Sequence, residues 1–119
     1  MKRPMMWRSS KYNNVRTGGY ASKLEAADSQ WLRHLEQTGG ISDLEEQVRY
    51  DFVINGKTLR HYARVDFRFK RCGKTVWYET KGFPTDMWRL KKEIIEATLP
   101  DDAVYMVNGT IYDILAIKE

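Results

Sequence analysis

The strongest constraint on the fold is an alternating run of residues bounded by two short turn signals. Between positions 59 and 69 the odd residues are mostly apolar and the even residues mostly polar, which predicts a β-strand with one buried face. An Asn-Gly pair at 55–56 precedes this run, and the four residues Arg-Cys-Gly-Lys at 71–74 follow it. Because short turns of this kind join antiparallel neighbours, the sequence predicts three consecutive antiparallel strands, at 46–54, 59–69 and 74–81.

Helical patterns flank these strands. Residues 22–37 carry apolar side chains at helical spacing and end before two glycines, and residues 85–98 follow a Gly-Phe-Pro break. The apolar stripes are predicted at Leu24, Ala27, Trp31 and Leu35 in the first helix, and at Met87, Leu90, Ile94 and Ile95 in the second. Residues 103–107 and 111–117 are two further strand candidates. The expected order is helix, three strands, helix, strand and one extra strand, an α/β fold with a mixed central sheet flanked by helices.

Length and charge narrow the class of protein. A chain of 119 residues forms one domain, which we expect at 21–119, preceded by a basic arm at 1–20. The net charge of +4 favours a polyanionic partner. A single cysteine excludes an internal disulfide and suits a reducing cytoplasm. We expect no membrane span, because no stretch approaches the roughly 20 apolar residues that one requires.

Three charged residues in the second and third predicted strands form the main candidate site. A turn centred between Cys72 and Gly73 would set Asp66 directly opposite Glu79, with Cβ atoms roughly 5 Å apart. Lys81 would project from the same face, because strand side chains alternate. Two carboxylates and one ammonium would then converge. A hard cation such as Mg²⁺ uses such carboxylates and keeps its other positions for water and substrate phosphate.

A solvated strand face with paired charges is the simpler interpretation of a Glu-x-Lys sequence, and such pairs contribute less than about 1 kcal/mol. Asp66 adds weight to the catalytic interpretation, since two opposed carboxylates destabilise a sheet unless a cation neutralises them.

Two other polar residues have alternative roles. Glu25 either completes a capping box with Ser22 or supplies a third acidic group above the sheet. Gln47 is predicted to face Arg64 and to share the face of Asp66, where its amide could bind a metal-bound water or a phosphate. A surface amide is the more common explanation for Gln47.

Several cations are candidate DNA contacts. Lys11 and Arg16 lie in the basic arm, and Arg89, Lys91 and Lys92 lie on the second predicted helix, shortly after the third strand. These helix cations either form an ordinary solvated face or follow a phosphate backbone.

The pattern of Asp66 followed by Glu79-Thr80-Lys81, with Glu25 in an early helix, resembles the PD-(D/E)XK nuclease superfamily. The predicted αβββαβ order is also the core of that superfamily, the restriction-endonuclease-like fold. The resemblance covers about residues 11–107 and is nearest to small phage-encoded endonucleases, including junction resolvases of the endonuclease I type. One departure is Val65, which stands where the motif has proline.

The resemblance implies a Mg²⁺-dependent DNA endonuclease, for which Mn²⁺ would substitute. Asp66, Glu79 and the Thr80 carbonyl would hold the metal, Lys81 would position the attacking water, and Glu25 would complete the acidic set. The expected substrate is branched or recombining phage DNA such as a Holliday junction, in the host cytoplasm. A two-fold symmetric junction suits a homodimer. The alternatives are a nicking, homing or restriction-like endonuclease with sequence preference, and a DNA-binding module without catalysis.

Overall fold

The structure, a computed structural model, describes residues 23–119. The predicted arm at 1–20, its candidate DNA contacts Lys11 and Arg16, and the helix cap at Ser22 lie outside the described residues.

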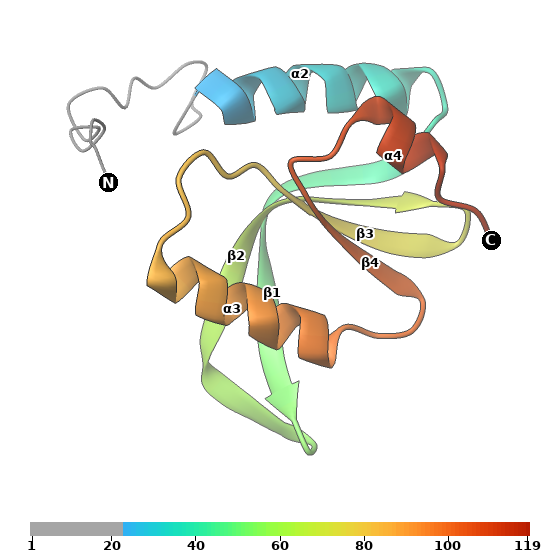
Figure 1. Ribbon diagram of the computed structural model, residues 1–119. Helices are drawn as coiled ribbons and strands as arrows, with labels where there is room; N and C mark the ends of the chain where they lie inside the picture. The colour runs from blue at the N-terminus through green and yellow to red at the C-terminus, as the bar shows by residue number, and fades with distance from the viewer. Residues whose placement is uncertain (1–22) are drawn as a thin grey trace.

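The described chain folds as an α/β structure in which helices cover both faces of a mixed sheet (Figure 1). The sheet order is β1-β2-β3-β4, with β1, β2 and β3 antiparallel and β4 parallel to β3. The elements of residues 23–119 follow one another as α2 (Lys23–Gln37), β1 (Ser42–Ile54), β2 (Lys57–Arg71), β3 (Lys74–Glu79), α3 (Asp86–Thr98), β4 (Ala103–Val107) and α4 (Ile111–Leu115). The predicted order of helix, three strands, helix and strand is confirmed.

Both predicted hairpin turns are present. Asn55 and Gly56 have φ values of 52° and 78°, and Cys72 and Gly73 have values of 51° and 78°. Two successive positive φ angles define a type I′ turn, whose twist matches that of the strands it joins. Each turn therefore fixes the pairing register of the strand ends beside it.

Two apolar clusters fill the space between the sheet and its helices. Leu32 and Leu35 of α2 pack with Val76 and Tyr78 of β3 and with Ile114 of α4. Ile95 of α3 belongs to the second cluster, with Tyr50, Phe52, Ala63 and Val65, and Trp77 packs against it. Because residues 76, 77 and 78 alternate between the two clusters, β3 is covered on both faces.

The hairpin formed by β1 and β2 changes its neighbours along its length. Ala63 and Val65 pack in the cluster of α3, whereas Phe67 and Phe69, next in the same alternation, pack in the cluster of α2. One side of β2 therefore turns from one helix layer to the other between Val65 and Phe67. Figure 1 shows the hairpin curving away from the sheet and projecting beyond α3. Asp66 lies at the turning point.

The predicted apolar stripes of both helices are partly wrong. In α2 the buried residues are Glu25, Ser29, Leu32 and Leu35, while Leu24 is 56% exposed. In α3, Met87 is 61% and Leu90 is 53% exposed, whereas Ile95 is fully buried. The α3 helix begins after its N-cap Thr85, whose side chain accepts a hydrogen bond from Trp88 N. Trp88 and Ile95, seven residues apart on one side of the helix, both contact the sheet.

The expected strand at 111–117 is wrong, because these residues form the short helix α4. Thr110 and Asp113 form a reciprocal capping box: Thr110 Oγ1 accepts from Asp113 N, and Asp113 Oδ2 accepts from Thr110 N. This arrangement satisfies two amide groups at the helix start and favours helix over strand. The third strand also ends earlier than predicted, at Glu79, so that Thr80 and Lys81 lie beyond it.

Candidate active site

The β2–β3 hairpin brings the two predicted acidic residues together. Phe67 pairs with Tyr78 and Arg71 with Lys74, so the same register continued by one residue sets Asp66 opposite Glu79. Side chains at opposed positions share one face of the sheet. The predicted register of this hairpin is confirmed.

The carboxylate of Asp66 is held by the loop that follows β3. Its Oδ2 accepts a hydrogen bond from Thr80 N at 2.9 Å, and its Oδ1 accepts one from Gln47 Nε2 at 3.3 Å. Burial nevertheless raises the pKa of Asp66 above its ordinary value, against the opposing effects of these hydrogen bonds and of the Lys81 charge. The protein thus holds this acid in an environment that disfavours its negative charge.

Glu79 is more fully buried than Asp66, with 7% of its surface exposed. Trp88 Nε1 donates to Glu79 Oε2 at 3.2 Å, and the Tyr105 hydroxyl donates to the same oxygen. Burial and the nearby negative charge of Asp66 raise the pKa of Glu79, although the Tyr105 and Trp88 hydrogen bonds lower it. Both hydrogen bonds fall on Oε2, and within residues 23–119 Oε1 accepts none.

These two raised pKa values predict a pH-dependent stability for the metal-free protein. Above the ordinary carboxyl pKa values of 3.8 and 4.5, the unfolded chain loses protons that the folded chain still binds. The free energy of unfolding therefore falls as pH rises from about 4 through the raised values. We expect the melting temperature, measured in EDTA between pH 4 and 8, to fall less steeply with pH for the Asp66→Asn, Glu79→Gln double variant than for wild type. Parallel curves for the two proteins would contradict this prediction.

Gln47 lies where the sequence did not predict. The register at Glu46–Phe67 and Val48–Val65 places it opposite Asp66, and Arg64 pairs with Arg49 instead. The pairing beside the Asn55-Gly56 turn shifts between Asp51 and Val53, and this irregularity changes the register of the whole inner part of β1. The expected position of Gln47 opposite Arg64 is therefore wrong. Gln47 lies directly opposite Asp66 instead and donates a hydrogen bond to it.

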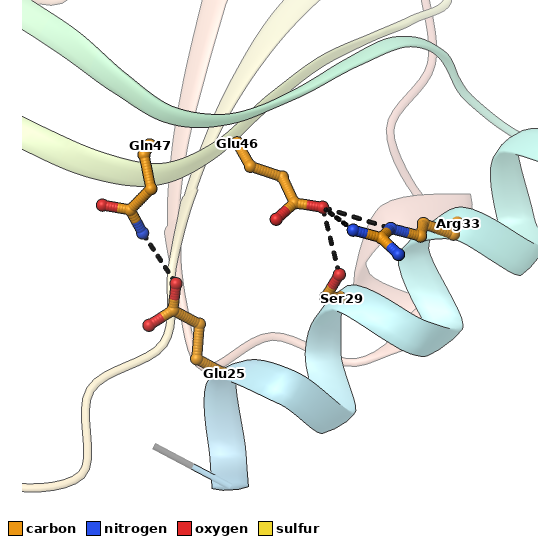
Figure 2. A network of polar contacts seen from close by, with 5 residues as sticks. All are labelled: Glu25, Ser29, Arg33, Glu46 and Gln47. Carbon is orange, nitrogen blue, oxygen red and sulfur yellow. Dashed lines mark hydrogen bonds and ion pairs between the residues drawn. The ribbon is translucent and has the colours of Figure 1, made fainter. Parts of the chain in front are cut away.

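Helix α2 joins the site through Gln47. Its Nε2 donates to Glu25 Oε2 at 2.7 Å as well as to Asp66, so one amide connects the two acids. Figure 2 shows the neighbouring residues Glu46 and Gln47 both reaching toward α2. Successive side chains of a regular strand point to opposite faces, and the positive φ of 56° at Gln47 removes that alternation.

Glu46 completes this connection. Its Oε2 accepts hydrogen bonds from Ser29 Oγ at 3.1 Å and from Arg33 Nη2 at 2.7 Å (Figure 2). Two adjacent residues of β1 thus bind α2 over two turns of helix, and they hold the helix that carries Glu25 against the sheet.

Lys81 follows β3 in a segment whose backbone is clamped to the end of β4. Lys81 N donates to Asn108 Oδ1 at 2.9 Å, and Asn108 Nδ2 donates to the Lys81 carbonyl at 2.8 Å. The Lys81 ammonium lies 5.7 Å from the centre of the Trp88 ring, a cation–π distance. Its charge favours the ionised forms of Asp66 and Glu79 by lowering the pKa of each carboxyl.

One cleft of about 600 Å³ contains all four predicted catalytic residues: Glu25, Asp66, Glu79 and Lys81. Thr80, Arg64 and Lys91 also line it, and apolar side chains of α2, of the loop between β3 and α3, and of α3 form part of its wall. A cleft that joins acids, cations and apolar surface is the usual form of a catalytic site. Within the described chain no Lys or Arg forms an ion pair with Asp66 or Glu79.

The candidate DNA contacts of α3 differ in their surroundings. Lys91 lines the cleft. Arg89 pairs with Asp86 at 3.1 Å, and Lys92 pairs with Glu96 at 2.7 Å, so both are partly neutralised within the helix. Lys91 is therefore the α3 cation best placed to meet a ligand in the cleft.

Four residues that support the site were missed by the sequence interpretation: Asp28, Trp88, Tyr105 and Asn108. Asp28 Oδ2 accepts from Thr80 Oγ1 at 2.6 Å and from the Tyr78 hydroxyl at 3.3 Å. Asp28 thereby fixes the residue whose amide binds Asp66. The spacing of Glu25 and Asp28, one helical turn apart, was the available signal, since such residues share a helix face.

The donor set suits a hard divalent cation. Its acidic members are oxygen ligands. Among residues 23–119, Asp66 and Glu79 lie opposite each other without an ion pair to Lys or Arg, and Glu79 Oε1 accepts no hydrogen bond. Residues 23–119 contain no cluster of three or more His, Cys, Asp or Glu side chains arranged to hold a metal. Magnesium sites commonly use one or two carboxylates and complete their shell with water and substrate phosphate, so this set fits that ion.

Comparisons with protein families, curated proteins and solved structures found no match to this chain. No helix of residues 23–119 is long and apolar enough to span a membrane.

Proposed function

We propose that this protein is a Mg²⁺-dependent DNA endonuclease of the PD-(D/E)XK type. The observation that carries the proposal is the convergence of Glu25, Asp66, Glu79 and Lys81 in one cleft, where the buried Glu79 lies opposite the partly buried Asp66. Keeping two like charges together costs stability, and a cation that binds both would offset that cost. The order of elements also fits the restriction-endonuclease-like core.

Asp66, Glu79 and the carbonyl of Thr80 are the proposed metal ligands. Bound there, Mg²⁺ or Mn²⁺ would supply a water of lowered pKa and neutralise charge on the scissile phosphate. Glu25 supports Asp66 through Gln47, whose amide connects the two carboxylates. The structure gives Gln47 hydrogen-bond partners on the protein, so we assign it to holding the acids rather than to contacting DNA.

Lys81 is proposed to orient the attacking water and to stabilise negative charge that develops on the phosphate. Its backbone is fixed on both sides by Asn108, which limits the positions that its ammonium can reach. Lys81 shares the cleft with the two carboxylates, and we assign it electrostatic stabilisation rather than free-base catalysis. Lys91 of α3 would contact a DNA phosphate in the cleft, and its helix neighbours Arg89 and Lys92 would contact phosphates beside it.

The proposed substrate is branched DNA, with a four-way junction as the model case and a homodimer as the active form. Each domain supplies one such cleft, and paired cuts in a two-fold symmetric junction need two clefts, one from each subunit of a dimer. The proposed context is phage DNA recombination in the host cytoplasm.

A cleavage panel tests this function. Supercoiled, linear and four-way-junction DNA are incubated with purified protein in Mg²⁺, Mn²⁺ or EDTA, and the products are mapped on sequencing gels. Metal-dependent cuts near the junction branch point are expected. Symmetric products at one duplex sequence would support a sequence-preferring nicking, homing or restriction-like enzyme instead. Binding without cleavage in either metal would support a non-catalytic DNA-binding module.

A further inference from the structure

The outer half of the β1–β2 hairpin has one apolar face and one basic face. Tyr50, Phe52 and Ala63 are buried with Ile95 of α3. The residues that alternate with them form the opposite face, which we call the arm face; its members are Arg49, Asp51, Arg60, Tyr62 and Arg64. This face is solvent-exposed apart from the half-buried Tyr62.

Two arginines of the arm face lie directly opposite each other. Arg49 pairs with Arg64 across the two strands, and like charges in such a position destabilise a sheet. Arg49 is partly compensated, because its Nε donates to Asp51 Oδ1 at 2.6 Å and its guanidinium lies 4.0 Å from the centre of the Tyr62 ring. Arg64 and Arg60 form no hydrogen bond or ion pair within the described part of the chain. The arm face therefore keeps a net positive charge.

The arm face is continuous with the cleft. Arg64 lines the cleft together with Lys81 and Lys91. Arg60 lies on the same strand, four residues closer to the Asn55-Gly56 turn. At about 3.3 Å per residue, Arg60 and Arg64 are roughly 13 Å apart along the strand. That distance spans about four nucleotides of one DNA strand at 3.4 Å each. Figure 1 shows the turn end of the hairpin projecting beyond α3.

We propose that the arm face binds the phosphate backbone of duplex DNA next to the scissile site. The inference rests on the proposed function for the choice of DNA as the polyanion. A duplex is favoured over a single strand because single-strand sites use open aromatic rings for base stacking, whereas the Tyr62 ring is covered by Arg49. Phosphate contacts of this kind carry no sequence information, and they fix the orientation of the duplex relative to the cleft.

The test measures binding in EDTA, so it does not depend on cleavage. Fluorescence anisotropy with a labelled 20-base-pair duplex, over a series of salt concentrations, compares wild type with Arg64→Gln and Arg60→Gln. Each variant should bind roughly five- to tenfold more weakly at about 0.1 M salt and lower the slope of log K against log salt by about 0.9. Arg64→Lys keeps the charge and should restore the slope. Lys70→Gln, an exposed cation at the other end of β2, should bind like wild type.

Thermal unfolding separates a binding defect from misfolding. Arg64→Gln removes one of two opposed like charges, so its melting temperature should equal or exceed that of wild type. Unchanged affinity and salt slope in both arginine variants would overturn the inference, as would an equal loss in Lys70→Gln or a preference for single-stranded DNA that the same variants reduce. A protein that binds duplex through the arm face but never cuts would retain this inference and reject the nuclease.

Discussion

Asp66→Asn and Glu79→Gln are each expected to lower the rate of Mg²⁺-dependent DNA cleavage by about a thousand-fold. Each amide keeps the volume of the acid and an oxygen that can still accept from Thr80 N, or from Trp88 and Tyr105. Each substitution therefore removes only the negative charge with which the acid would bind the metal ion. Single-turnover cleavage of a junction substrate at saturating protein measures the chemical step without product release.

Two further measurements make this result specific. DNA binding by both variants should be equal to or tighter than wild type, because one carboxylate no longer repels phosphate. Glu93→Gln removes an exposed acid of α3 and should leave cleavage unchanged. Full cleavage by Asp66→Asn or Glu79→Gln would reject the assignment of a metal to these residues.

Lys81→Gln is expected to reduce single-turnover cleavage by roughly a hundred- to a thousand-fold, the usual cost of removing one electrostatic stabiliser of a transition state. The clamp from Asn108 acts on the Lys81 backbone, so the substitution changes the side chain without releasing the loop. Binding of uncleaved DNA in Ca²⁺ should change little by comparison. The effect is then on the rate constant of cleavage rather than on affinity.

Lys91→Gln provides the matched comparison, since this cation lines the same cleft from α3. It should weaken DNA binding while the cleavage rate at saturation stays within a few-fold of wild type. Lys81→Arg tests position against charge, because a guanidinium cannot place its hydrogen-bond donors where an ammonium does. Recovery of full activity in Lys81→Arg would show that charge alone suffices and would contradict the proposed orienting role.

The sequence predicted the part of the site that a single tight turn determines. A two-residue turn at Cys72-Gly73 allows one register, and that register sets Asp66 opposite Glu79. The Asn55-Gly56 turn was also predicted correctly, yet Gln47 was not. The pairing shift between Asp51 and Val53 lies several residues from the turn, and no local signal in β1 marked it.

Other errors have a similar physical origin. The apolar residues of 111–117 suited either strand or helix, and the reciprocal cap of Thr110 and Asp113 decides for helix. In α3 apolar residues occur on more than one side of the helix, and its packing on the sheet buries Ile95 while Met87 and Leu90 stay exposed. Trp88, Tyr105 and Asn108 reach the site only through the packing of α3 and β4 on the sheet. Contacts between segments so far apart in the sequence have no periodic signature.

The assignment of site residues to separate elements has a consequence for partial unfolding. Glu25 comes from α2, Asp66 from β2, Glu79 from β3, Trp88 from α3 and Tyr105 from β4. Detachment of either helix layer exposes the cleft and removes a partner of one acid, even while the four strands stay paired. Catalytic competence should therefore disappear at lower denaturant concentration than β-sheet circular dichroism, which makes activity the more sensitive reporter of the native state.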